Sequence, residues 1–317
     1  MLSLPGPAQQ PTLYFIGVTT AQSSIMRLFP EWAQVLGIED AVIKGIDLDI
    51  HAPVEDYRQC VEFIKNDPLS MGALVTTHKI DIYNAANDLF DVLDPYAVRF
   101  GEISSISKRD NRLIGHAKDP ITSGKALDAF IPEHHWAGTN AEVVVLGAGG
   151  SALAISAYLA QAKFAGNYPG KIHLTNRSAP RLASANKILS DLPVPMSFHL
   201  CPEPGMNDRI VESVPAGSLI VNATGLGKDR PGSPLTDQVQ FPDKAIIWEL
   251  NYRGTLEFLH QAQKQQEARN LQIEDGWTYF IHGWTEVISE VFDSALTDHK
   301  LRLCEKIARA GNPPHLS

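Results

Sequence analysis

The stretch Val143-Val-Val-Leu-Gly147-Ala-Gly149-Gly-Ser-Ala152 decides the fold of this chain. It places a GxGxxA pattern directly after an apolar, β-branched run and directly before an Ala-rich segment, which is the context of a strand, a tight turn and a helix. Gly147 permits the turn, Gly149 lets the backbone approach a pyrophosphate, and the small Ala152 lets the helix pack closely on the strand. The stretch therefore predicts a dinucleotide-binding domain, with a glycine-rich turn that holds no ligand as the alternative.

The helix that follows this loop presents its N-terminus to the pyrophosphate, because free N–H groups and the helix dipole favour negative charge there. We expect the whole loop to bind the cofactor: Gly147, Ala148, Gly149, Gly150, Ser151 and Ala152.

The choice of cofactor depends on the end of the next predicted strand. Lys171–Thr175 is followed by Asn176-Arg177, where an acid would be expected if the site bound a free ribose 2′-hydroxyl. An Arg suits a 2′-phosphate, and Arg181 lies one helical turn further on. Asn176, Arg177 and Arg181 are therefore predicted cofactor residues, and NADP is favoured over NAD. The alternative for Arg177 is a solvated surface residue.

Strand and helix patterns alternate through two regions of the chain. In the first region, apolar runs at 13–17, 41–48 and 72–77 alternate with amphipathic segments at 23–36 and from residue 53 onward. In the second region, strands are expected at 143–146, 171–175, 218–222 and 245–250, with helices at 151–164 and 181–189. This alternation is typical of βαβ units with a mostly parallel sheet. It predicts an α/β protein with two doubly wound α/β domains, the second of the Rossmann type.

A break in the pattern marks the domain boundary. Phe130–Asn140 contains Pro, Gly and two His just before the restart of the strand pattern. We place a substrate-binding catalytic domain at 1–138 and the NAD(P)-binding Rossmann domain at 139–275. Apolar spacing from Tyr279 to Leu296 predicts helices in 276–317 that pack back on the first domain.

Composition excludes several classes of protein. The 317 residues carry a formal charge of −9, which argues against nucleic acid or an anionic membrane surface as a partner. The three cysteines, Cys60, Cys201 and Cys304, have no CxxC spacing, so neither a disulfide framework nor a metal site is predicted. Because there is no signal sequence and no apolar run of about 18 residues, we expect a cytoplasmic protein, either a monomer or a homodimer.

These segments together resemble the shikimate/quinate dehydrogenase family, in order from residue 17 to about residue 290. In the second region the resemblance covers the glycine loop, Asn176-Arg177, the strand end Val221-Asn-Ala-Thr224, and Tyr252 followed by Thr255-Leu256. In the first region, Val75-Thr-Thr-His-Lys79 resembles the strand end with the family's catalytic Lys, and Gly115-His-Ala-Lys-Asp119 resembles the segment with its catalytic Asp.

Other segments depart from the family pattern. Gln22-Ser23-Ser24-Ile25-Met26 replaces a His-Ser-x-Ser-Pro stretch, so Ser23 is the residue retained. The family's Asn-Thr-Asp is Ala117-Lys118-Asp119, its Asn-Thr after Gly-Ala-Val is Ser104-Ser105, and His282 stands near the family's substrate-binding Gln. The reaction residues match the family while the substrate-binding residues differ.

The resemblance implies an NADP-dependent dehydrogenase that acts on a ring hydroxyl of an anionic, shikimate- or quinate-like polyhydroxy acid, as in aromatic amino acid biosynthesis. Lys79 would exchange the hydroxyl proton and Asp119 would orient it, provided that desolvation lowers the Lys pKa. The implied substrate-binding residues are Ser23, Thr76, Ser104, Tyr252 and His282. Asn222 and Thr224 would join the cofactor site.

Plainer interpretations stay open for these residues. Lys79 can be a surface residue, Asp119-Pro120 can be a helix start, and the Ser and Thr residues can be caps. Three alternative functions are a dehydrogenase of the same fold with another cyclic substrate, a non-catalytic dinucleotide-binding regulator, and a relative that acts on amino acids.

Overall fold

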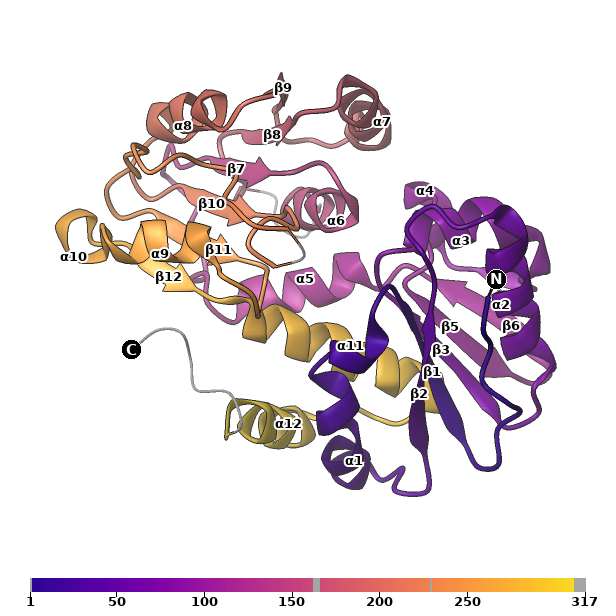
Figure 1. Ribbon diagram of the computed structural model, residues 1–317. Helices are drawn as coiled ribbons and strands as arrows, with labels where there is room; N and C mark the ends of the chain where they lie inside the picture. Colours follow the sequence, from indigo (N-terminus) through magenta and orange to yellow (C-terminus); the bar gives the residue numbers. More distant parts are fainter. Residues whose placement is uncertain (1, 162–165, 229, 311–317) are drawn as a thin grey trace. The chain divides into compact units, whose positions relative to one another are not determined.

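The computed structural model describes residues 2–161, 166–228 and 230–310, which form two compact units (Figure 1). The first unit contains the described residues up to Lys118 together with Ile281–Ala310, and the second contains Asp119–Phe280. The chain therefore crosses between the units after residue 118 and again after residue 280, whereas the sequence analysis placed its domain boundaries after residues 138 and 275.

Within the described residues, the first unit is built on a six-stranded sheet in the order β2-β1-β3-β5-β6-β4. Strands β2, β1 and β3 are parallel, as predicted, but β5 runs antiparallel to both β3 and β6, so the sheet is mixed. The strands are β1 (Thr12–Gly17), β2 (Val42–Asp47), β3 (Ser70–Val75), β4 (Val92–Leu93), β5 (Ser105–Arg109) and β6 (Arg112–His116).

Helices of the first unit cover this sheet with one apolar face each. In α2, the residues Tyr57, Cys60, Val61 and Ile64 recur at helical spacing and are buried, which is the pattern of an amphipathic helix. The helices are η1 (Thr20–Gln22), α1 (Ile25–Leu36), α2 (Val54–Asn66), α3 (Lys79–Ala86), η2 (Asn87–Leu89), α4 (Pro95–Phe100), the later part of α11 (Gly276–Phe292) and α12 (Asp298–Ala310).

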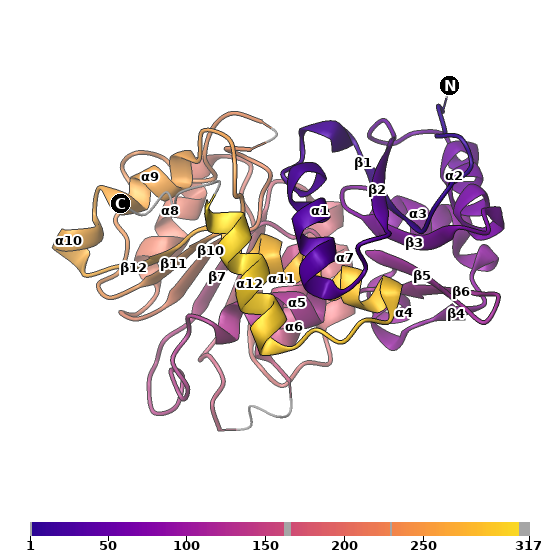
Figure 2. The same cartoon turned by 90° about the horizontal axis from the view of Figure 1, so that it is seen from below.

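The last helix returns to the start of the chain. Figures 1 and 2 both show α12 beside α1. The buried Trp32 of α1 donates its indole N–H to the backbone oxygen of Cys304 in α12 at 3.0 Å, and Phe15 of β1 packs edge-on against Trp284 of α11. The predicted return of the C-terminal helices to the first part of the chain is confirmed.

The second unit contains a wholly parallel six-stranded sheet in its described residues, in the order β12-β11-β10-β7-β8-β9. Counted from β7, this is the order 3-2-1-4-5-6 of a Rossmann domain, with the switch point between β7 and β10. The strands are β7 (Val143–Leu146), β8 (Ile172–Asn176), β9 (Met196–Leu200), β10 (Leu219–Asn222), β11 (Ile246–Glu249) and β12 (Gln272–Glu274).

Close packing of two helices stabilises the side of this unit next to β7. A Cβ atom at Gly124 of α5 would lie 2.1 Å from the ring of Tyr158 in α6, so the glycine is what lets the helices approach. The described helices of the second unit are α5 (Asp119–Asp128), α6 (Gly150–Leu159), α7 (Ala179–Leu189), α8 (Pro204–Ser213), α9 (Glu257–Gln263), α10 (Gln266–Arg269) and the first turns of α11. Residues 162–164 of the predicted helix 151–164 lie outside the described residues.

Candidate functional site

The glycine loop has the conformation that its sequence predicts. Gly147 follows β7 with a φ of +126°, and a Cβ there would lie 2.8 Å from the backbone oxygen of Ala223, so a side chain is excluded. Gly149 caps α6 without a side chain, and a Cβ on it would meet no atom within 4 Å. The backbone N–H groups at the start of α6 therefore border open space, which fits the pyrophosphate of a dinucleotide. Ala152 is fully buried against the strand.

Asn176 and the two arginines lie at the carboxyl end of β8. The Asn176 side chain accepts a hydrogen bond from the backbone N–H of Ser178 at 2.9 Å and so shapes the turn into α7. Arg177 and Arg181 are exposed, and neither makes an ion pair with another described residue. Both guanidinium groups are thus available to an anion, which is what a 2′-phosphate site requires.

The carboxyl end of β10 is fixed by the side chain of Asn222. This fully buried amide donates to Oε2 of Glu249 at 2.8 Å and accepts from the backbone N–H and the hydroxyl of Thr224, at 3.1 and 2.7 Å. The contacts set the course of the chain after β10. The cofactor roles of Asn222 and Thr224 stay predictions.

Sequence reasoning missed Glu249, the last residue of β11. It has no exposed surface and also accepts from the backbone N–H of Asn251 at 2.8 Å. The Asn251 amide in turn donates to the backbone oxygens of Thr224 and Leu226, at 3.2 and 3.0 Å. Burial raises the pKa of Glu249 to about 8, against the opposing effect of its hydrogen-bond donors. The available signal was an acid that ends a strongly apolar strand.

Aromatic residues gather at the start of α11, in the second unit. The ring of Tyr252 lies 4.4 Å from that of Phe280 and 5.3 Å from that of Trp277, measured between centroids. The hydroxyls of Tyr279 and Ser151 are 2.9 Å apart, so α11 is hydrogen-bonded to the first turn of α6. Tyr252, a predicted substrate residue, is thus half-buried in an aromatic cluster.

In the first unit, Thr76 and Lys79 follow β3 at the carboxyl end of the parallel strands. The Thr76 hydroxyl donates to the backbone oxygen of Ile16 at 3.2 Å, and Lys79 is the half-buried first residue of α3. The predicted proton-transfer Lys therefore lies at a strand end, where α/β proteins bind ligands.

The residue before Lys79 was also missed as a site residue. His78 is 1% exposed, with Nε2 3.0 Å from the backbone oxygen of Leu48 and Nδ1 3.3 Å from the Tyr57 hydroxyl. Because a carbonyl can only accept, Nε2 carries the proton. Burial lowers the pKa of His78, although the backbone acceptors work in the opposite direction. A neutral, anchored His78 therefore fixes the start of α3.

Three other predicted substrate residues lie in the first unit. Ser23 is half-buried after η1, and its backbone oxygen accepts from Met26. His282 is a half-buried residue of α11. Ser104 is 2% exposed, and its hydroxyl oxygen accepts from the backbone N–H of Lys118 at 2.7 Å, so that hydroxyl holds the segment before Asp119.

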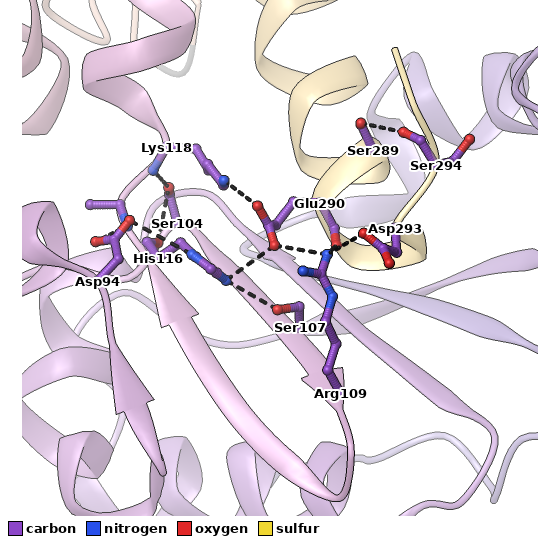
Figure 3. Close-up of polar contacts among 11 residues, drawn as sticks. Asp94, Ser104, Ser107, Arg109, His116, Lys118, Ser289, Glu290, Asp293 and Ser294 are labelled. Atoms are coloured by element: carbon purple, nitrogen blue, oxygen red, sulfur yellow. Dashed lines mark hydrogen bonds and ion pairs between the residues drawn. The ribbon is translucent and has the colours of Figure 1, made fainter.

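Lys118 takes part in a polar network that Figure 3 shows, between the ends of β5 and β6 and the last turn of α11. Its ammonium donates to Glu290, which also lies 3.0 Å from Arg109 and 3.5 Å from His116. His116 lies 3.0 Å from the hydroxyl of Ser107. The Lys118 charge is therefore neutralised by Glu290 within the first unit.

Asp119 is the first residue of α5 and of the second unit, and it is 7% exposed. Its backbone oxygen accepts from the hydroxyl of Ser123 at 2.6 Å. The alternative expectation that Asp119-Pro120 starts a helix is confirmed, and the proton-orienting role stays a prediction.

Two searches of the described residues gave no site. No group of three or more His, Cys, Asp or Glu side chains among them could hold a metal ion. No helix among them is long and apolar enough to cross a membrane. All three cysteines are buried and free.

Comparison with known proteins finds relatives for the chain, although no protein-family model matches it. Three of the relatives are curated as "Shikimate dehydrogenase (NADP(+))". The Lactococcus lactis enzyme is 29% identical over 177 residues, which is 55% of this chain and only 59% of that enzyme. The Streptococcus thermophilus enzyme is 26% identical over 74% of this chain and 78% of its own. The Paramagnetospirillum magneticum enzyme is 26% identical over 84% and 87%.

The chain belongs to the shikimate/quinate dehydrogenase family. Solved structures with this family's names share its fold. A shikimate dehydrogenase in complex with NADP+ has a TM-score of 0.72 at 19% identity and covers 98% of this chain and 100% of its own. A quinate dehydrogenase from Corynebacterium glutamicum in complex with NAD has a TM-score of 0.71 at 16% identity, over 95% and 99%. The two-domain α/β fold with a Rossmann-type domain is thereby confirmed.

Proposed function

We propose that this chain is an NADP-dependent oxidoreductase of the shikimate dehydrogenase type. The observation that carries the proposal is the glycine loop at the switch point of the second sheet, followed one strand later by two exposed arginines. The printed names of the curated relatives, "Shikimate dehydrogenase (NADP(+))", support the same cofactor.

The second unit would hold the dinucleotide. The start of α6, with Gly149 as an open N-cap, would receive the pyrophosphate, and Arg177 with Arg181 would pair with the 2′-phosphate. When bound, the nicotinamide supplies the hydride acceptor or donor. The buried contacts of Asn222 and Glu249 would keep the chain after β10 in one conformation.

The proton is the task of the protein's own side chains. Oxidation of a secondary alcohol releases the hydroxyl proton, and the ammonium group of Lys79, when deprotonated, would accept it at Nζ. The Asp119 carboxylate would accept a hydrogen bond from the substrate and so orient it. The anchored His78 would hold Lys79 at the end of β3.

We propose a ring hydroxyl of a shikimate- or quinate-like polyhydroxy acid as the reacting group. A structure of a relative is titled as a complex with NADP(H) and shikimate. Ser23, Thr76, Ser104, Tyr252 and His282 remain the proposed substrate residues. The predictions of a cytoplasmic location and of a monomer or homodimer stay predictions.

A second candidate is a dehydrogenase of this fold with another cyclic substrate. The observation that favours it is the pairing of Lys118 with Glu290, which removes a cation that would otherwise offset a substrate carboxylate.

The experiment is a turnover screen at 340 nm with NADP and NAD against shikimate, quinate and uncharged cyclitols. We expect turnover with NADP, and loss of at least 100-fold in kcat for Lys79→Ala. Lys187→Ala, at an exposed position of α7, is the matched control and is expected to retain activity. Binding of NADPH without turnover on any of these compounds would contradict the enzyme and favour a regulator. Turnover with cyclitols alone would select the second candidate.

A further inference from the structure

We propose that Glu290 is a positioning residue that acts through Lys118 on Asp119. This inference rests on the proposed function, because it assigns the task of orienting the reacting hydroxyl to Asp119. Glu290 lies in the last turn of α11 and is separated from Asp119 by 171 positions of the sequence, so no local pattern links the two.

Glu290 is the acid on which three basic side chains converge (Figure 3). Lys118 donates to Oε2, while Arg109 and His116 lie 3.0 and 3.5 Å from Oε1. Arg109 also donates to the backbone oxygen of Glu290 at 2.6 Å. Only 17% of the Glu290 side chain and 14% of the Lys118 side chain are exposed, so water screens the pair weakly.

The charge state of Glu290 agrees with this role. Burial alone would raise its pKa, but the hydrogen bond from Lys118 and the positive charges nearby together hold the pKa below its ordinary value. Glu290 is therefore a carboxylate at neutral pH, and its attraction for the Lys118 ammonium is fully present.

The segment that Lys118 ends is held by its backbone as well. The N–H of Ala117 donates to Oδ1 of Asp94 at 3.3 Å, and the N–H of Lys118 donates to the hydroxyl of Ser104 at 2.7 Å. With the ammonium bound to Glu290, residues 117 and 118 are fixed at three points, all within the first unit. Asp119 is the next residue of the chain, so its backbone position follows from theirs.

Loss of the Glu290 charge would release this segment. Lys118 and Arg109, with His116 between them, would then face one another without the acid that separates them, and repulsion would move the most mobile group, the Lys118 side chain. A displacement of about 1 Å in an orienting group lowers rates by about 100-fold. The Asp94 carboxylate cannot replace Glu290, because it already caps α4 through the N–H of Ala97.

The test compares Glu290→Gln and Lys118→Met, singly and together, with Asp293→Asn as the matched control. Asp293 contacts the same Arg109 at 3.3 Å, but 82% of its side chain is exposed. We expect each of the first two variants to lower kcat by about 10- to 100-fold with NADPH affinity unchanged, and the double variant to be no worse than the weaker single one. Asp293→Asn should retain kcat within about twofold. Additive losses in kcat, or losses confined to KM, would overturn the proposal.

A second measurement separates this proposal from the function on which it rests. Amide hydrogen exchange of residues 117–119 needs no turnover. We expect exchange there to be at least about 10-fold faster in Glu290→Gln than in the wild-type protein or Asp293→Asn. Unchanged exchange overturns the proposal, even in an active enzyme. If the wild-type protein turns over neither shikimate nor quinate, the proposed function fails, and the exchange rates alone decide whether Glu290 fixes the segment.

Discussion

The stability of the second unit should depend on pH through one buried carboxyl group. Glu249 has no exposed surface, and burial raises its pKa to about 8, whereas a Glu in the unfolded chain has a pKa of about 4.3. Between these values the folded protein keeps a proton that the unfolded chain has lost. The contribution of Glu249 is therefore fully present below about pH 4 and is lost as the pH rises through 8.

The magnitude follows from that difference in bound protons. Each pH unit in the interval lowers the free energy of unfolding by about 1.4 kcal/mol, so the change from pH 5 to pH 8 is about 4 kcal/mol. Glu249→Gln removes the titration. The stability of the wild-type protein relative to this variant should fall by that amount across the interval and stay constant above it.

The assay is urea unfolding at several pH values, followed by the fluorescence of the fully buried Trp248 and its neighbours. Taking the difference between wild-type protein and variant at each pH cancels all other titrating groups. Glu212→Gln, an exposed acid of the same unit, is the control and should run parallel to the wild-type protein. A difference between wild-type protein and Glu249→Gln that stays constant within about 0.5 kcal/mol from pH 5 to 8 would refute the reasoning.

Three further predictions concern the second unit. Gly147→Ala should weaken NADPH binding by at least about 10-fold, because its Cβ would lie 2.8 Å from the Ala223 oxygen at a φ of +126°; titration by fluorescence measures it, with the unstrained Gly205→Ala as control, and equal affinities would contradict it. Arg177→Gln should weaken NADPH by about 10- to 100-fold and leave NADH unchanged; an equal loss for both cofactors would show that Arg177 does not recognise the 2′-phosphate. Gly124→Ala should lower the free energy of unfolding by about 2 kcal/mol or more, since its Cβ would overlap the Tyr158 ring; an unchanged urea midpoint would mean that the two helices separate at little cost.

The parts of the fold that sequence predicted are those with strong local patterns. Val143–Leu146 is apolar at every position and is followed by glycines that one turn type requires, so strand, loop and helix could be placed closely. The hairpin β5–β6 was missed although Asp110 and Asn111 between its strands have φ values of +50° and +63°. An Asp-Asn pair of that kind is a turn signal, but the flanking strands carry Lys and Arg and lack clear alternation.

The candidate site divides in the same way. The loop around Gly147 could be read from the sequence because backbone geometry demands glycine there. The partners of Lys118 could not, because Glu290 reaches it only through tertiary packing of α11. Likewise, nothing near Trp32 in the sequence points to the carbonyl of Cys304. Contacts over such separations are properties of the folded chain alone.

The double passage of the chain between its units has a consequence for synthesis. The second unit is one continuous segment, whereas the first needs the described residues beyond 280, including the helix that receives the Trp32 indole N–H and the Lys300 ammonium that donates to Leu36. During translation the segment made second can therefore finish folding first. The beginning of the chain must wait, with the apolar face of α1 uncovered, until the last helix leaves the ribosome. A fragment that stops before residue 298 should accordingly aggregate, even though it contains every residue proposed to touch cofactor or substrate.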